Sequence, residues 1–247
     1  SLSASRLINA EYQYALNLNN PNALALLQSA ASDYYNALLR LHELLPNDPD
    51  IVSALNRAQS YLATITAINA FEPLVVKASL ILSDSNPTYV EFTKLVDQYN
   101  STHDPKLIPM IQSYASQLLN QLANAGVTPQ AIEAARSVAS VQGVDPEARS
   151  MINTDAAALF EAYNALLAVA AGQNANVAIP AASKKFITSD MLDRLYGKYA
   201  SETYNFLMSI PEPLRSLLGF TYGMGEWLNS LTLTLAYYLG LPGAYAI

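Results

Sequence analysis

Six times along this chain, a residue that can cap a helix is followed directly by proline. A side-chain oxygen of Asn, Asp or Thr accepts a hydrogen bond from a backbone N–H group of the first helical turn. Proline is favoured at the next position, because the N–H group that it lacks would have had no partner there. We therefore expect helices to start at these pairs: Asn20-Pro21, Asp48-Pro49, Asn86-Pro87, Asp104-Pro105, Thr128-Pro129 and Asp145-Pro146.

Between these pairs the apolar residues recur every three to four positions, as on one face of a helix. Leu107, Ile111, Leu118 and Leu122 are one example. Only residues 230–236 alternate as a strand would. We predict an all-α fold, a multi-helix antiparallel bundle of about ten to twelve helices. The predicted helices are 4–18, 22–45, 50–70, 73–83, 88–101, 106–124, 130–141, 147–152, 156–171, 190–209, 211–222 and 226–239.

The longest polar interruption of this pattern lies between two parts of unequal hydropathy. The chain has 247 residues. Because a domain averages about 150 residues, this length corresponds to one large domain or to two unequal ones. We predict a helical core domain over 1–172, a linker or long loop over 173–187, and a hydrophobic C-terminal helical segment over 188–247.

Charge is scarce in this chain. Charged residues make up 13%, against about 25% in an ordinary domain. Without cysteine, the chain has no disulfides, thiolate metal sites or cysteine nucleophiles. A net charge of −7 is a poor match for nucleic acid, and Lys184-Lys185 is too small a basic patch to change that. We expect no metal, no cofactor and no direct nucleic-acid partner.

The titratable residues have structural explanations. His42 is placed near a helix end, where it would favour the negative end of the helix dipole. His103 is expected to be solvated. The aspartates stand mostly at caps, among them Asp155 in a further helix start at Thr154-Asp155. We therefore expect a protein that is not an enzyme.

Three long runs carry no charge at all: 107–132, 162–183 and 227–247. The first two are predicted helices whose polar faces consist of amides and hydroxyls. The chain also has sixteen Tyr against six Lys, and Tyr enrichment with Lys depletion is typical of protein interfaces. We therefore expect these faces to make protein contacts.

The third run ends the chain. A spanning helix needs about 20 mainly apolar residues, whereas this run includes Asn229, Thr232 and Pro242. We expect it to contact other subunits, with membrane contact as the alternative. The residues predicted to make these contacts are Trp227, Leu231, Leu235, Tyr237, Tyr238 and Tyr245.

Three short segments resemble the helical repeats of peridinin–chlorophyll proteins, which are soluble and all-α. They are 104–107, 126–128 and 150–153. The resemblance implies pigment binding through a helix histidine. That histidine would fall near Ala115 or Ser116, and neither side chain can take its role, so we do not assign the family.

The leading hypothesis is a structural subunit outside the cytoplasm, in a virion, filament or cell-surface layer, that associates with itself or with other subunits. Because the chain begins with serine, we expect any targeting segment to have been removed. Asn100-Ser101-Thr102 matches the N-glycosylation pattern, in an expected loop. Alternatives are a membrane-peripheral subunit of a larger complex, or a module for an apolar ligand or pigment. Tyrosines would line that ligand's cavity: Tyr34, Tyr61, Tyr114 and Tyr163.

Overall fold

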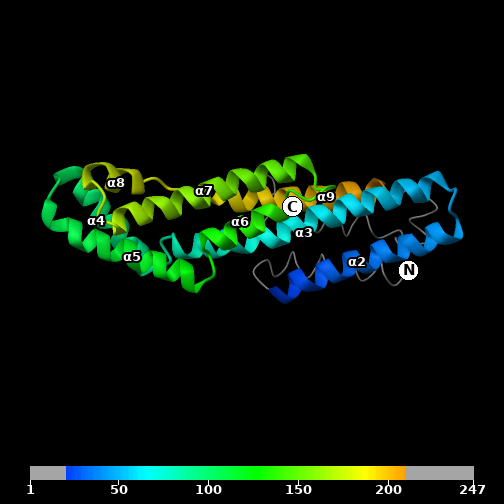
Figure 1. Cartoon of the computed structure of the whole chain (residues 1–247), viewed down its shortest axis with the longest axis horizontal. Coiled ribbons are helices and arrows are strands. Elements are labelled where there is room, and N and C mark those ends of the chain that lie inside the picture. Colours follow the sequence, from blue (N-terminus) through cyan, green and yellow to red (C-terminus); the bar gives the residue numbers. More distant parts are fainter. Residues whose placement is uncertain (1–20, 210–247) are drawn as a thin grey trace, which may run out of the picture. The chain divides into compact units, whose positions relative to one another are not determined.

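The computed structural model describes residues 21–209, and every element in this range is helical (Figure 1). This confirms the all-α prediction for the described part. The elements are α2 (Pro21–Leu44), α3 (Pro49–Ile81), α4 (Pro87–Thr102), the 3-10 helix η1 (Pro105–Leu107), α5 (Ile108–Asn124), α6 (Pro129–Val138), α7 (Pro146–Ala170), α8 (Ala175–Ala182) and α9 (Ser189–Ser209). The predicted helices 4–18, 211–222 and 226–239 and the alternating stretch 230–236 lie outside the described residues, so the total of ten to twelve stays a prediction, as does the hydrophobic C-terminal segment.

All six proline pairs coincide with the start of an element, as predicted. The cap of the first pair, Asn20, lies outside the described residues. In each of the other five, the cap oxygen accepts a backbone N–H bond of 2.9–3.2 Å. The bonded pairs are Asp48 with Asp50, Asn86 with Thr88, Asp104 with Lys106, Thr128 with Ala131, and Asp145 with Ala148.

Two predicted breaks are wrong, because packing carries the helix through them. The ranges 50–70 and 73–83 are a single helix, α3, with Pro73 inside it. Proline removes one helical hydrogen bond, but Phe71 is fully buried beside it and Val75 follows on the same stripe. Likewise 147–152 and 156–171 are a single helix, α7.

The second break rested on Asp155 as a cap. Asp155 instead lies in the middle of α7 and is only 1% exposed. A stripe of buried residues runs through the predicted break at a spacing of three to four, which keeps the helix continuous. Its members are Ala148, Ile152, Ala156, Leu159, Ala162 and Leu166.

The predicted linker or long loop 173–187 contains the helix α8. The Asn174 side chain caps α8 by accepting a 3.1 Å bond from the Asn176 N–H group. Ala178, Ile179 and Ala182 are buried on its inner side. The sequence did contain a signal for α8: three small or branched apolar residues at helical spacing within a polar stretch.

The chain divides into two compact units, each built from stretches that alternate along the sequence. Unit 1 holds 1–70, 138–149 and 193–247, of which 21–70, 138–149 and 193–209 are described; unit 2 holds 71–137 and 150–192. The predicted division at 172 and 188 stays a prediction.

Each unit has its own core and its own polar ties. In unit 1, Ile65 and Ile68 are fully buried in α3. The loop before α7 is tied to α3 by a 2.7 Å bond from Ser60 Oγ to the Gly143 carbonyl. In unit 2, Phe92, Ile111 and Leu118 form part of the core.

In unit 2, Gln121 of α5 ties down the start of α4. Its Oε1 accepts a 2.7 Å bond from Asn86 Nδ2, and its Nε2 donates a 3.0 Å bond to Thr88 Oγ1. Asn86 is the residue that caps α4. This amide pair therefore fixes the packing of α4 against α5.

Candidate interaction surfaces

The outer face of α5 carries no charge. Its exposed residues are Pro109, Met110, Ser113, Ser116, Gln117, Asn120, Ala123 and Asn124. The opposite side is apolar and buried: Ile111, Ala115, Leu118 and Leu122. A helix at a protein surface ordinarily has charged residues on its solvent side. The expectation of an amide and hydroxyl face is thus confirmed for α5.

A second uncharged surface lies at the end of α7 and along α8. Leu167 is 45% exposed and Val177 is 66% exposed. The side chain of Gln112 lies next to Gly172, because a Cβ added to that glycine would stand 3.4 Å from Gln112 Nε2. Tyr99 donates a 2.7 Å bond to Asn176 Oδ1, which joins α4 to the start of α8. The middle of the second charge-free run, where α7 gives way to α8, thus contacts α5 through Gly172 and α4 through Asn176.

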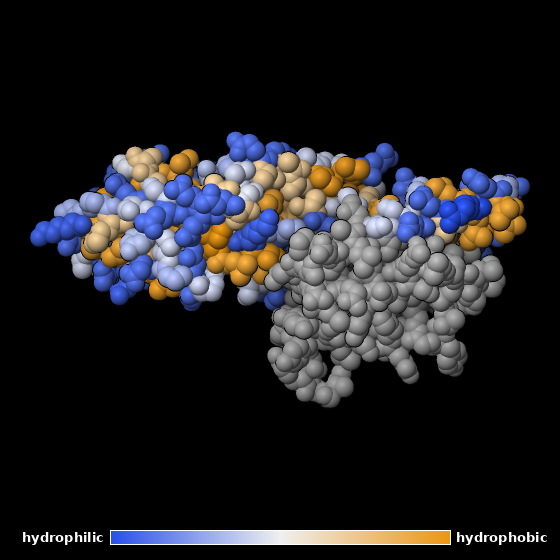
Figure 2. Space-filling view, turned by 90° about the horizontal axis from the view of Figure 1, so that it is seen from below, coloured by the Kyte–Doolittle hydropathy of each residue, from blue (hydrophilic) through white to orange (hydrophobic). Residues whose placement is uncertain are grey.

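The turn from α2 to α3 is the third surface. Leu44 is 76% exposed, Leu45 is 50% exposed and Val52 is 38% exposed. Figure 2 shows an apolar area at this turn, with hydrophilic residues beside it. His42, expected near a helix end, lies in the last turn of α2, where its position suits the helix dipole.

An apolar cavity in unit 2 is too small for the ligand classes that we considered. Its volume is about 10 Å³, which is room for about one water molecule, whereas drug-sized ligands need roughly 300 Å³ or more. It is lined by Leu82, Tyr89, Phe92, Ala162, Leu166, Ala182, Lys184, Phe186 and Ile187. Tyr61, Tyr114 and Tyr163, which were expected to line a ligand cavity, are not among them.

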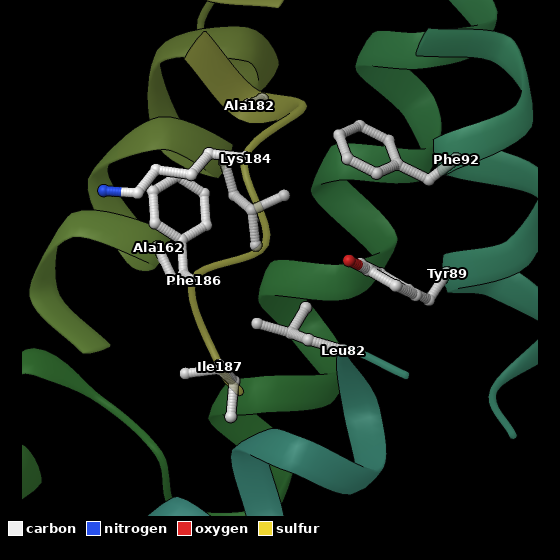
Figure 3. Close-up of a pocket in the computed structure, with 9 residues that line it drawn as sticks. Leu82, Tyr89, Phe92, Ala162, Ala182, Lys184, Phe186 and Ile187 are labelled. Carbon is white, nitrogen blue, oxygen red and sulfur yellow. The ribbon is translucent and has the colours of Figure 1, made fainter. Parts of the chain in front are cut away.

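The hydroxyl group of Tyr89 points into this cavity (Figure 3). Burial raises the pKa of Tyr89, and the negative charges of Asp84 and Asp97 raise it further. Lys184 runs past the ring of Phe186, with its Nζ 5.6 Å from the ring centroid and 3.0 Å from Glu161 Oε1. A neutral phenol and a lysine already paired with a carboxylate give the cavity no activated acid or base.

A compact ion cluster lies in unit 1. Lys198 of α9 is 9% exposed and contacts three carboxylates at 2.9 Å each: Asp145, Glu147 and Glu202. Burial alone would lower the pKa of Lys198, but hydrogen bonds to the three carboxylates outweigh it and raise the pKa above its usual value. A lysine held in its charged form is not a nucleophile at neutral pH.

The same cluster sets the ionisation of Asp145. Burial alone would raise its pKa, but hydrogen bonds from Lys198 and from the Ala148 N–H group lower it. Asp145 therefore caps α7 as a charged carboxylate, close to the positive end of the helix dipole. The chemistry of the cluster is that of a structural tie between α7 and α9.

The other predicted site residues fall in different places. The predicted C-terminal contacts lie outside the described residues: Trp227, Leu231, Leu235, Tyr237, Tyr238 and Tyr245. Asn100 lies inside α4, near its end, and not in the expected loop; its side chain is half-buried and its Oδ1 is buried. His103 is exposed, as expected, and forms the C-cap of α4 with a left-handed φ of 54°.

The described residues contain no cluster of three or more His, Asp or Glu suited to a metal ion. Within 21–209, α3 is the one helix long and apolar enough to cross a membrane, by length and composition alone. Half of its most apolar stretch is buried inside the protein, and the core helix of a soluble protein passes the same test. Sequence reasoning missed α3 as a candidate because it placed a break at Pro73.

Comparisons of the whole chain with protein-family models, with curated proteins and with solved structures found no match.

Proposed function

We propose that this chain is a structural subunit without enzymatic activity, which associates with further copies of itself in an assembly outside the cytoplasm. A virion, a filament and a cell-surface layer are assemblies of this kind. The observation that carries the proposal is the outer face of α5, where eight exposed residues are all uncharged.

The physical reason lies in the cost of removing charges from water. A charge buried without a partner costs several kcal/mol, whereas amides and hydroxyls can bond across an interface at little cost. Interfaces are accordingly poor in Lys and Glu. Exposed apolar residues such as Met110, at 46% exposure, add area that a partner would remove from water.

The extracytoplasmic part of the proposal rests on composition. A low charge content supports it. The acceptor pattern at Asn100 adds little, because Asn100 lies inside α4 with its Oδ1 buried. A mass measurement of chain secreted from a eukaryotic host, before and after glycosidase treatment, tests the acceptor.

The first experiment is size-exclusion chromatography with light scattering on the full chain, without detergent and over a range of concentrations. A defined oligomer, or a filament in the void volume, is the expected result. A 26.7 kDa monomer at every concentration would overturn the proposal.

Two nearly isosteric variants then test the α5 face. Gln117→Glu and Asn120→Asp each place one carboxylate on it without changing its shape. We expect association to weaken at least tenfold, because an unpaired charge in an interface costs more than about 1.4 kcal/mol. The control is Gln98→Glu, at an exposed position of α4 beside Asp97. If all three variants associate equally strongly, the α5 face is not part of the interface.

A further inference from the structure

The turn from α2 to α3 combines exposed apolar side chains with exposed acids. Leu44 has the most exposed large apolar side chain of the described residues, at 76%, and Leu45 and Val52 belong to the same turn at 50% and 38%. Glu43 and Asp50 are exposed there as well. We refer to these five residues as the turn surface. Its apolar part is visible at the end of the molecule in Figure 2.

The charge near the turn surface is negative. Residues 41–56 contain three acids and no Lys or Arg. Two arginines flank this range. Arg57 already has an interaction within the protein, and Arg40 is exposed one turn before Leu44. Three acids against the single charge of Arg40 make the turn attractive to further cations.

The end of α2 adds to this negative charge. The Leu45 N–H group donates a 2.9 Å bond to the Leu41 carbonyl and closes the last turn of the helix. The carbonyl groups of residues 42–44 follow this bond and form the negative end of the helix dipole. An acid is unfavourable at this end, and Glu43 stands there nevertheless. A local rule broken in this way is expected where a residue serves a function, and here a cation from outside would compensate it.

These features limit the partner. The apolar side chains gain most from apolar contact. The acids and the last carbonyl groups of α2 favour Lys or Arg. An anionic membrane surface would repel the acids. A second copy of this chain, with a net charge of −7, is a poor electrostatic match as well.

We propose that the turn surface binds a basic amphipathic segment of another protein. The apolar side chains of that segment cover Leu44, Leu45 and Val52. Its Lys or Arg side chains pair with Glu43 and Asp50. A contact of this size is small, so we expect transient binding. The inference goes beyond the proposed self-association, because the turn belongs to unit 1 and the α5 face belongs to unit 2.

A labelled synthetic helix of leucine and lysine, with the leucines on one face, is a probe of this chemistry. Its fluorescence anisotropy is measured while the full chain is added at low salt. We expect binding, and weaker binding at about 0.5 M salt, where exposed charges are screened. A second probe, in which glutamate replaces every lysine, should bind at least tenfold more weakly.

Two matched pairs of variants separate the turn surface from the general negative charge of the chain. Leu44→Asn changes the last turn of α2, and its control Leu80→Asn changes the last turn of α3, where Leu80 is 57% exposed. Glu43→Gln removes a carboxylate of the turn surface, and its control Glu91→Gln removes an exposed one of α4. We expect at least threefold weaker binding of the lysine probe for each turn variant and unchanged binding for each control. Circular dichroism checks that all four variants remain folded.

The outcomes decide the proposal. If the lysine probe does not bind the wild-type chain, or if each turn variant binds it as its control does, the proposal is overturned. It is also overturned if the chain binds vesicles that contain anionic lipid and Leu44→Asn abolishes that binding, because the turn would then be a membrane contact. None of these results bears on self-association, which light scattering measures separately, so the two proposals can fail independently.

Discussion

Lys198 offers the sharpest test of what holds unit 1 together. Lys198→Met keeps the aliphatic stem and removes the ammonium group, so Asp145, Glu147 and Glu202 lose the cation that each contacts at 2.9 Å. Breaking a buried ion pair by removing one partner costs about 3–5 kcal/mol. Glu147 is 65% exposed and keeps much of its hydration. We therefore expect a loss of about 2 kcal/mol, and a Tm lower by roughly 4–8 °C for a chain of this length.

The pH dependence of this loss follows from the pKa directions. Asp145 has a lowered pKa, so its contribution is complete above its unfolded pKa of about 3.9 and is lost as the pH falls through the folded value. Lys198 has a raised pKa, so its contribution is complete below about pH 10. The cost of Lys198→Met should thus be constant between about pH 6 and 8 and shrink below about pH 4.

Urea denaturation of dilute protein at pH 7 and pH 3 measures this cost. The matched control is Lys184→Met, which removes a pair whose partners are 61% and 54% exposed. A surface pair of this kind contributes less than about 1 kcal/mol. Equal losses from the two variants at pH 7, or a larger loss from Lys198→Met at pH 3 than at pH 7, would refute the reasoning.

Three further substitutions test local features of unit 2. His103→Gly should stabilise the chain by about 0.5–1 kcal/mol, because His103 has a φ of 54° that glycine adopts without strain; an unchanged or lower Tm would contradict this. Gln121→Leu should cost about 1–3 kcal/mol in urea denaturation, because it removes the bond from Asn86 Nδ2 and the bond to Thr88 Oγ1; a neutral result would mean that water replaces both bonds. Asn174→Ala should cost about 1 kcal/mol by loss of the α8 cap, and hydrogen exchange should rise first in the α8 amides.

The helix starts were predictable because their signal is local. A cap oxygen and the N–H group that it accepts from lie two or three residues apart, so the pair can be found in the sequence alone. The continuity of α3 and α7, by contrast, has no local signal in the sequence, because it depends on tertiary packing. Pro73 and Asp155 each weaken a helix by themselves, and only burial of their neighbours, such as Phe71 and Ala156, keeps the helix intact.

The ion cluster could not be found in the sequence for the same reason. Lys198 and Glu147 are separated by 51 residues, and their contact depends on how α9 packs against the start of α7. The only local signal is the spacing of Lys198 and Glu202, which is that of an ordinary pair on one helix face. Nothing in that spacing indicates that Asp145 completes the site.

Charges and uncharged faces have different expected roles in this protein: the ion cluster contributes to stability, and the uncharged faces contribute to association. In unit 1, Lys198 is almost buried among carboxylates, and Arg149 donates to the backbone carbonyls of Ala139 and Val144, which closes the loop before α7. In unit 2, the exposed faces of α5 and α8 carry no charge. Removing an inner charge should therefore lower stability without changing the α5 or α8 surface. Adding an outer charge, as in Gln117→Glu, should weaken association while the Tm of the dissociated chain stays the same. A chain in which both kinds of variant lowered the Tm equally would have its uncharged faces packed within the monomer.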